Sequence, residues 1–339
     1  MKIFGREFRN KPLLIAFSAI LSASVVALII AGSILGSRHS KPSDPPSDTP
    51  ITPTQTRVLA VGGSLPFIEY GKSLFVWNSP KKPHLSNTER ITALWTPGSA
   101  RDDLFNFYVE QGFISAVVYA GCAQWEGAQY AKGEFPFGGE QNFIDTLELY
   151  RDKHMEINAL VYLNDDYNDL TSNRAEMVQM AAYFNKFAKY GLNSLVLDIE
   201  PQTLNKPGQL DLFASLYADI LAAAPDIKII PTMKNAWFKC QNGDCVVDTL
   251  NSVGVKEYWL MAYSSDPKLV VWMAENARKY ADNVNILIET DDIGDSSVSY
   301  HDKIVSDKQQ FFDDYANMVS QIGPVSIHSY LGFLDISNN

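Results

Sequence analysis

The sequence predicts an α/β fold of the (β/α)8 barrel (TIM-barrel) type, in which eight parallel strands close into a ring inside a layer of helices. After about residue 70, eight short apolar segments alternate with amphipathic segments of helical period. The apolar segments are continuous Val/Ile/Leu runs, as is typical of parallel strands covered on both faces. Eight such units in roughly 270 residues match the usual size of this barrel. An open doubly wound sheet is the alternative, but no glycine-rich phosphate loop follows the first predicted strand.

The predicted elements follow from these runs. The strands are Ser73–Asn78, Ile114–Ala120, Ile157–Leu163, Ser194–Ile199, Ile227–Thr232, Glu257–Ala262, Val284–Glu289 and Pro324–Tyr330. The helices between them are Arg101–Gln111, Asn142–Lys153, Arg174–Tyr190, Gln209–Ala223, Pro267–Tyr280 and Lys308–Ile322, with a shorter connection at Asp244–Val253.

The first seventy residues have a different composition. Residues 1–12 carry four basic residues and one acidic residue, and residues 13–36 contain no charge. An apolar run of about 20 residues is long enough to span a bilayer as a helix, whereas the apolar region of a cleaved signal peptide is commonly about 7–15 residues. The positive flank predicts a cytoplasmic N-terminus. We therefore expect a basic cytoplasmic tail and a transmembrane signal-anchor, with cleavage near Ala31 as the alternative.

Residues 37–70 are expected to be a linker, because their first part is rich in Pro, Ser and Thr and poor in apolar residues. The remaining residues, 71–339, form the predicted barrel domain. This order predicts a single-pass membrane protein whose barrel lies outside the cytoplasm, in the periplasm or at the cell surface. The chain has a formal net charge of −11, so we expect no nucleic-acid partner.

Cysteine and histidine are sparse in this chain. Cys240 and Cys245 flank a short Asn-Gly turn and are expected to form a disulfide outside the cytoplasm, with two reduced thiols as the alternative. Cys122 is expected to be a small buried apolar residue. The five histidines form no ligand pattern, so no metal and no cofactor is predicted.

The most informative residues are Asp198 and Glu200, at the end of the fourth predicted strand. Alternation along a strand places both carboxylates on one face, above Val196. Carboxylates are costly to bury, and the C-terminal end of a barrel strand is where this fold carries its chemistry.

Other strand ends supply aromatic and acidic residues to the same predicted opening. Aromatic rings stack on the apolar faces of sugars, and carboxylates accept hydrogen bonds from their hydroxyl groups. The predicted substrate-binding residues are Trp77, Tyr119, Trp125, Tyr162, Asp165, Trp237, Met261 and Tyr330.

Asp198-Ile-Glu200 and Met261-Ala-Tyr263 together resemble the family 18 glycoside hydrolases, the chitinase-like barrels. The resemblance implies that Glu200 is the general acid, that Asp198 orients an N-acetyl group and that Tyr263 donates a hydrogen bond to it. The two earlier acids of that family's motif correspond to Asn193 and Val196 here, so a non-catalytic relative is the alternative.

A second interpretation uses Glu289, on the seventh predicted strand. Glu200-Pro201 and Glu289 are similar to the acid/base and nucleophile glutamates of a large clan of retaining barrels, which hold the two carboxyl groups about 5–5.5 Å apart. The acids at the mouth are also compatible with an ion-pair network that includes Lys234, or with an oxygen-ligated Mg²⁺ or Ca²⁺ ion.

The sequence thus predicts a membrane-anchored glycoside hydrolase-like protein that acts on an envelope or extracellular polysaccharide, with N-acetylated sugars favoured. Its catalytic residues are expected to be Glu200, Asp198, Tyr263 and Glu289. The alternatives are a barrel that binds glycan without cleaving it and an envelope scaffold. Polysaccharide and the membrane are the expected partners.

Overall fold

The computed structural model describes residues 73–77, 87–134, 138–163, 170, 173–202, 204–239 and 245–332. All of them lie in one compact unit, Thr56–Asn339. The predicted tail, transmembrane segment and linker lie outside the described residues. Within the described part of the chain, no helix has the length and apolar character needed to cross a membrane.

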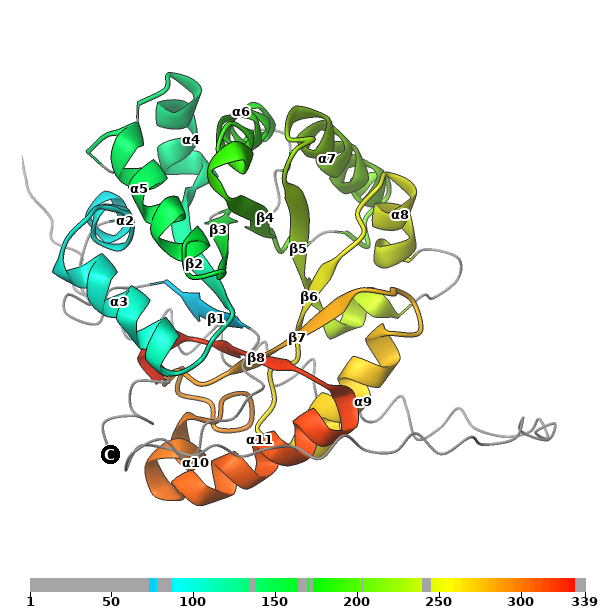
Figure 1. Cartoon of the computed structure of the whole chain (residues 1–339). Coiled ribbons are helices and arrows are strands. Elements are labelled where there is room, and N and C mark those ends of the chain that lie inside the picture. Colours follow the sequence, from blue (N-terminus) through cyan, green and yellow to red (C-terminus); the bar gives the residue numbers. More distant parts are fainter. Residues whose placement is uncertain are drawn as a thin grey trace, which may run out of the picture. The chain divides into compact units, whose positions relative to one another are not determined.

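The prediction of a parallel barrel is confirmed. Eight parallel strands pair in chain order and close where the first strand meets the last (Figure 1). They are β1 (Ser73–Val76), β2 (Ser115–Cys122), β3 (Glu156–Tyr162), β4 (Leu192–Asp198), β5 (Lys228–Lys234), β6 (Tyr258–Met261), β7 (Val284–Glu289) and β8 (Val325–His328).

Helices surround the strands on the outside of the barrel (Figure 1). They are α2 (Asn87–Trp95), α3 (Ser99–Glu110), α4 (Ala123–Ala131), α5 (Glu140–Arg151), α6 (Arg174–Asn185), α7 (Gln209–Ala223), α8 (Val246–Ser252), α9 (Pro267–Ala277), α10 (His301–Ser306) and α11 (Lys308–Ile322). Two short 3₁₀ helices cover Ala188–Tyr190 and Asn235–Phe238.

Local signals explain where several helices begin. Asp266 precedes α9 and accepts a hydrogen bond from the Lys268 amide at 2.9 Å, and Pro267 occupies the first turn. Asp307 caps α11 in the same way through the Gln310 amide, at 3.1 Å. Such caps satisfy amide groups that have no partner inside the helix.

The apolar core has two parts, separated by the barrel wall. The larger part lies between the strands and the surrounding helices. The smaller part fills the barrel with one buried side chain from each of the first seven strands: Phe75, Val117, Leu160, Val196, Ile230, Trp259 and Leu287. Because side chains alternate along a strand, the residues two positions later also face the barrel axis, nearer its C-terminal mouth.

Three described helices, α2, α4 and α10, were not predicted from the sequence. The predicted helix Arg174–Tyr190 ends at Asn185 and is followed by the first 3₁₀ helix. The predicted strand Pro324–Tyr330 ends at His328, and the chain turns there into a short helical segment.

The cysteine expectations are met as far as the described residues reach. Cys245 is disulfide-bonded, and Cys122 is a buried thiol in β2. Cys240, the expected partner of Cys245, lies outside the described residues.

Candidate functional site at the barrel mouth

The barrel places carboxylates from two opposite strands at its C-terminal mouth. Asp198 ends β4 and lies two residues after the buried Val196, as the alternation predicted. Glu289 ends β7 and lies two residues after the buried Leu287. The two strands are separated by β5 and β6 on one side of the closed ring, so their carboxylates face the mouth from different directions.

Asp198 is held by its neighbour on β5. The Thr232 hydroxyl donates a hydrogen bond of 2.6 Å to Asp198 Oδ1. Burial and the negative charge of Glu200 raise the pKa of Asp198 to about 6. A carboxyl group with this pKa can exchange a proton near neutral pH, as general acid–base catalysis requires.

Glu200 forms an ion pair with Lys234, at the end of β5. The Lys234 ammonium lies 2.8 Å from Glu200 Oε2, and both side chains are partly exposed, at 35% for Lys234 and 24% for Glu200. The same ammonium lies 5.7 Å from the centre of the Trp237 ring. The ion pair that the sequence allowed is thus present.

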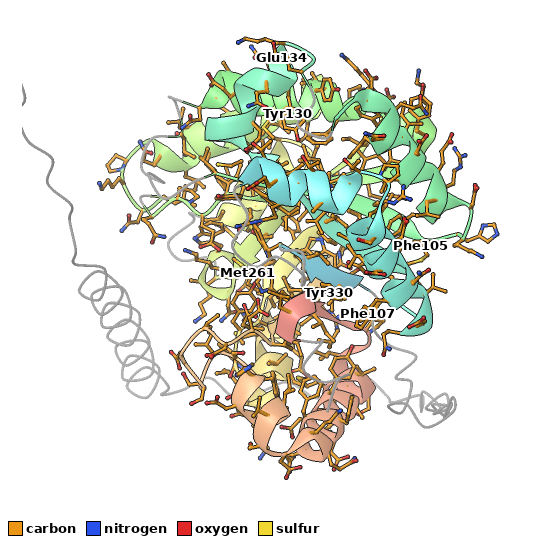
Figure 2. The ribbon with its side chains drawn as sticks, turned by 90° about the vertical axis from the view of Figure 1, so that its left-hand side faces the viewer. Phe105, Phe107, Tyr130, Glu134, Met261 and Tyr330 are labelled. Atoms are coloured by element: carbon orange, nitrogen blue, oxygen red, sulfur yellow. The ribbon has the colours of Figure 1, made fainter. Side chains whose placement is uncertain are left out.

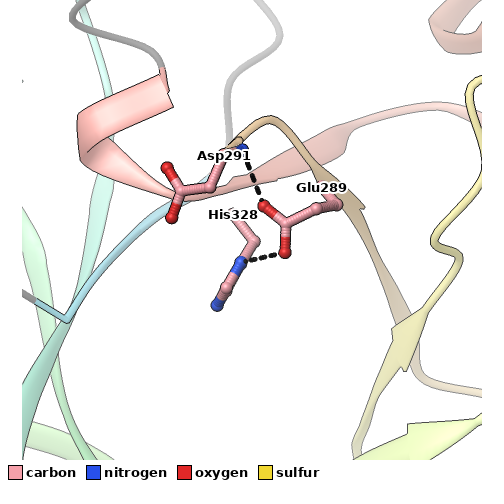
Figure 3. Close-up of side chains that lie close together, drawn as sticks. All are labelled: Glu289, Asp291 and His328. Carbon is pink, nitrogen blue, oxygen red and sulfur yellow. Dashed lines mark hydrogen bonds and ion pairs between the residues drawn. The ribbon is translucent and has the colours of Figure 1, made fainter. Parts of the chain in front are cut away.

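Glu289 is buried and bound by three donors, of which Figure 3 shows the Asp291 amide and the His328 ring. The amides of Thr290 and Asp291 each donate to Glu289 Oε1 at 2.8 Å. The other oxygen, Oε2, lies 2.7 Å from Nδ1 of His328, the last residue of β8. Both oxygens are therefore engaged, which is a poor arrangement for a nucleophile that has to attack a sugar carbon.

The opposite edge of the His328 ring contacts Trp77, which follows β1. The Trp77 indole N–H donates to His328 Nε2. The Tyr263 ring lies 5.6 Å from the imidazole, centre to centre. Burial and the charges of Glu289, Asp198 and Glu200 raise the pKa of Tyr263, so its hydroxyl keeps its proton and can donate a hydrogen bond.

Glu289, Asp291 and His328 also have the composition of a metal site. One ligand atom from each lies within 4.8 Å of the others. The Asp291 oxygens, however, accept hydrogen bonds from the Ser329 hydroxyl and the Gly332 amide. The Glu289 oxygens and both imidazole nitrogens are engaged as well, so we assign no metal to this group.

The structure brings together most of the residues expected at the mouth. Trp77 stacks on Tyr119 with ring centres 5.6 Å apart and meets the edge of Tyr162 at 5.7 Å. Tyr119 is fully buried, so it supports the Trp77 ring by stacking and is not itself exposed to a ligand. Met261 packs against the side chains inside the barrel.

Other expected residues lie elsewhere. Tyr330 is buried outside the barrel, 4.9 Å from the ring of Phe107 on α3 (Figure 2), because the strand has already ended at His328. Trp237, by contrast, lies near the mouth, because its ring centre is 5.7 Å from the Lys234 ammonium that pairs with Glu200, and it also packs against Phe213 of α7. Asp165 and the side chain of Trp125 lie outside the described residues, so their roles stay predictions.

Sequence reasoning missed Thr232, and it placed Asp291 and His328 at the ends of the seventh and eighth predicted strands without giving them a role. It also gave Lys234 no role beyond a partner for the acids. Each of the four lies at the end of a strand or two residues after an inward-facing residue, and this position is the signal that marks them.

The comparisons with known proteins concern the fold. No family model matches this chain, and no curated protein matches it in sequence. Among solved structures, a chitinase from Bacteroides thetaiotaomicron has a TM-score of 0.51 at 10% identity, over 78% of this chain and 90% of that one.

Other structural neighbours have different activities. An endo-1,4-beta-mannanase from Eisenia fetida has a TM-score of 0.44 at 12% identity, over 80% of this chain and 86% of that chain. A sugar phosphate isomerase/epimerase from Parabacteroides distasonis has a TM-score of 0.43 at 12% identity, over 84% and 95% of the two chains. At these identities the likeness concerns the fold alone and leaves activity to be argued from the site.

Proposed function

We propose that this protein is a glycoside hydrolase-like barrel, anchored in a membrane and facing away from the cytoplasm, that cleaves an envelope or extracellular polysaccharide containing N-acetylated sugars. The observation that carries the proposal is the Asp198–Glu200 pair at the barrel mouth, opposite Tyr263 and Trp77. Two coupled carboxylates beside a tyrosine donor and an aromatic ring provide proton transfer together with sugar binding.

In this proposal Glu200 gives a proton to the oxygen of the glycosidic bond as that bond breaks, and water then bonds through its oxygen to the freed anomeric carbon and returns a proton to Glu200. Burial and the negative charge of Glu200 raise the pKa of Asp198 to about 6, so Asp198 can hold a proton beside Glu200 close to neutral pH. The Tyr263 hydroxyl donates a hydrogen bond to the N-acetyl oxygen, while Asp198 accepts one from the N-acetyl N–H. Substrate has to draw Lys234 away from Glu200 before Glu200 can carry the proton.

The second candidate function is glycan binding without cleavage. The Lys234–Glu200 ion pair favours it, because the Lys234 ammonium lies 2.8 Å from Glu200 Oε2, the oxygen from which a general acid would have to donate its proton. The two functions differ in what removal of Lys234 does. In an enzyme, removal of Lys234 leaves Glu200 free to act as the general acid. In a binding protein, the same change removes a contact to the glycan.

The test uses the full-length chain in detergent with N-acetylated and neutral oligosaccharides, with products identified by mass spectrometry and binding measured by calorimetry. An enzyme is expected to cleave at least one oligosaccharide, and Glu200→Gln is expected to reduce the rate by at least about a hundredfold. Glu257→Gln is the matched control, because Glu257 also pairs with a β5 lysine, Lys228, but at the other end of the strand.

Lys234→Met, with Lys228→Met as its control, separates the two functions. In an enzyme, the loss of Lys234 is expected to shift the pH dependence of cleavage while cleavage persists. Binding without products in the parent and in every variant would reject hydrolysis and leave the glycan-binding function. Neither binding nor cleavage of any oligosaccharide would reject both.

A further inference from the structure

His328 connects several strands at the mouth. It ends β8, its Nδ1 faces Glu289 of β7 at 2.7 Å, and its Nε2 accepts the indole N–H of Trp77 after β1. The Tyr263 ring, beyond β6, lies 5.6 Å from it. Nothing in the proposed hydrolysis uses this imidazole directly.

The direction of these hydrogen bonds fixes the protonation of the ring. An indole N–H can only donate, so the His328 Nε2 that receives it carries no proton. The proton of the neutral imidazole therefore sits on Nδ1 and is donated to Glu289 Oε2. Glu289 is itself held by the Thr290 and Asp291 amides at 2.8 Å. Two backbone amides therefore fix the carboxylate that in turn orients the His328 ring.

The same contacts determine how Trp77 is presented. One face of its indole is covered by Tyr119, at 5.6 Å and an interplanar angle of 29°. The edges meet Tyr162 and His328, at 5.7 and 5.9 Å. The indole is only half-buried, so part of it remains accessible at the mouth.

We propose that His328 is a positioning residue: it fixes the orientation of the Trp77 indole, on which a sugar ring of the substrate stacks, and Glu289 acts through His328. The sugar-stacking part rests on the proposed function, whereas the orientation of Trp77 by His328 does not. This assignment replaces the nucleophile role that the sequence suggested for Glu289. One Glu289 oxygen accepts the Thr290 amide, and the other accepts the proton on His328 Nδ1.

Protonation of His328 is expected to break this arrangement. A proton on Nε2 would point at the indole N–H, so Trp77 would lose its acceptor. The charged and titratable groups that face the imidazole are Glu289, Asp291, Asp198 and Tyr263. Burial alone lowers the pKa of His328, but the three carboxylates outweigh it and raise that pKa above 6.5.

The first test needs no ligand. The full-length chain has six tryptophans, so the fluorescence of Trp77 is taken as the difference between the parent and Trp77→Phe. We expect this difference to titrate with a midpoint above 6.5, and Glu289→Gln to lower the midpoint because it removes the carboxylate that holds the proton. In His328→Gln the difference is expected to be constant with pH. A titration that persists in His328→Gln, or one absent from the parent, would overturn the proposal.

The second test measures oligosaccharide affinity by calorimetry at pH 8.0. His328→Gln keeps an oxygen that can accept the indole N–H and is expected to retain the parental affinity. His328→Phe keeps a ring without an acceptor and is expected to weaken binding by about three- to tenfold, the usual effect of one hydrogen bond. Glu289→Gln should weaken binding in the parent but have no further effect in His328→Gln. Equal affinities of His328→Gln and His328→Phe would contradict the positioning role.

The two tests separate this inference from the proposed function. A pH-dependent Trp77 fluorescence signal without oligosaccharide binding would support His328 as the residue that orients Trp77. It would reject the part of the proposal in which a sugar ring stacks on Trp77. Oligosaccharide cleavage together with a Trp77 fluorescence signal that is the same in the parent and in His328→Gln would support the glycosidase function. It would reject the positioning role of His328.

Discussion

At the scale of single residues, the mouth contains two carboxylates with very different surroundings, Asp198 at the end of β4 and Glu200 two residues beyond it. Asp198 is bound to a neutral hydroxyl, and Glu200 is bound to an ammonium group. The sequence places both on the same face but says nothing about the partner that each will meet. Burial and the negative charge of Glu200 raise the pKa of Asp198 to about 6, whereas the hydrogen bond from Thr232 lowers it.

This raised pKa predicts a stability effect at residue 198. The folded chain holds the Asp198 proton more strongly than the unfolded chain, so stability falls as the pH rises from 3.8 to about 6. Asp198→Asn, which has no charge to bury, should therefore be more stable than the parent at pH 8 by about 1–2 kcal/mol, and equal to it near pH 3.5. Urea unfolding at both pH values measures this difference. If Asp198→Asn is less stable than the parent at pH 8, the ionised Asp198 carboxylate stabilises the folded chain and the prediction is wrong.

The hydrogen bonds of Glu289, Asp291 and His328 predict that this group needs no metal. Its oxygens accept hydrogen bonds from protein donors, His328 Nε2 accepts the Trp77 indole N–H, and Nδ1 donates its proton to Glu289, so a cation would have to displace these bonds. Millimolar EDTA, Mg²⁺, Ca²⁺ or Zn²⁺ is therefore expected to leave the Tm unchanged within about 1 °C, in contrast to the mass-action stabilisation that a resident ligand gives. A rise in Tm with one cation that disappears in Asp291→Asn would mean that a site exists.

At the scale of elements, α4 was missed from the sequence because its small and mixed residues give no clear helical stripe. The structure gives a reason for that composition. Gly127 lies in α4 where a Cβ would come within 2.7 Å of the Glu176 Cβ on α6. The two helices can approach this closely only because Gly127 has no side chain.

The close contact predicts that Gly127→Val destabilises the barrel by about 2–3 kcal/mol, because the two helices must move apart to accommodate the added groups. Gln129→Val, a change on the same helix at a half-buried position, is the control and should cost less than about 1 kcal/mol. Both values can be read from urea unfolding curves. Equal effects of the two changes would place the cost in the helix propensity of valine and not in the helix contact.

At the scale of the whole molecule, the N-terminal residues carry a prediction that the barrel does not test. Residues 1–12 and 13–36 are expected to anchor the chain with its N-terminus in the cytoplasm. The full chain should then sediment with membranes after an alkaline wash and be released by detergent, while a chain that begins at residue 60 should stay in solution. A protease added outside intact cells or spheroplasts should digest a tag at the C-terminus and spare one at the N-terminus. Release of the full chain by the alkaline wash would refute the anchor.

The sequence by itself determined the eight strands, the parallel barrel and the inward-facing position of Asp198 at the end of the fourth strand. Each of these follows from local information: the period of apolar residues along the chain and the alternation of side chains along a strand. Tyr330 marks the limit of such reasoning. It would share a face with His328 if the strand continued, but the strand ends at His328 and the tyrosine packs outside the barrel against Phe107.

Only the tertiary structure decided which side chains at the mouth meet. Trp77 and His328 are 251 residues apart in the chain, and they form a hydrogen bond because β1 and β8 become neighbours when the barrel closes. Lys234 reaches Glu200 because β4 and β5 pair in a register that the turn residues do not reveal. Local periodicity sets the face of each side chain, whereas strand pairing and register set its neighbours, and those neighbours determine charge, proton position and chemistry.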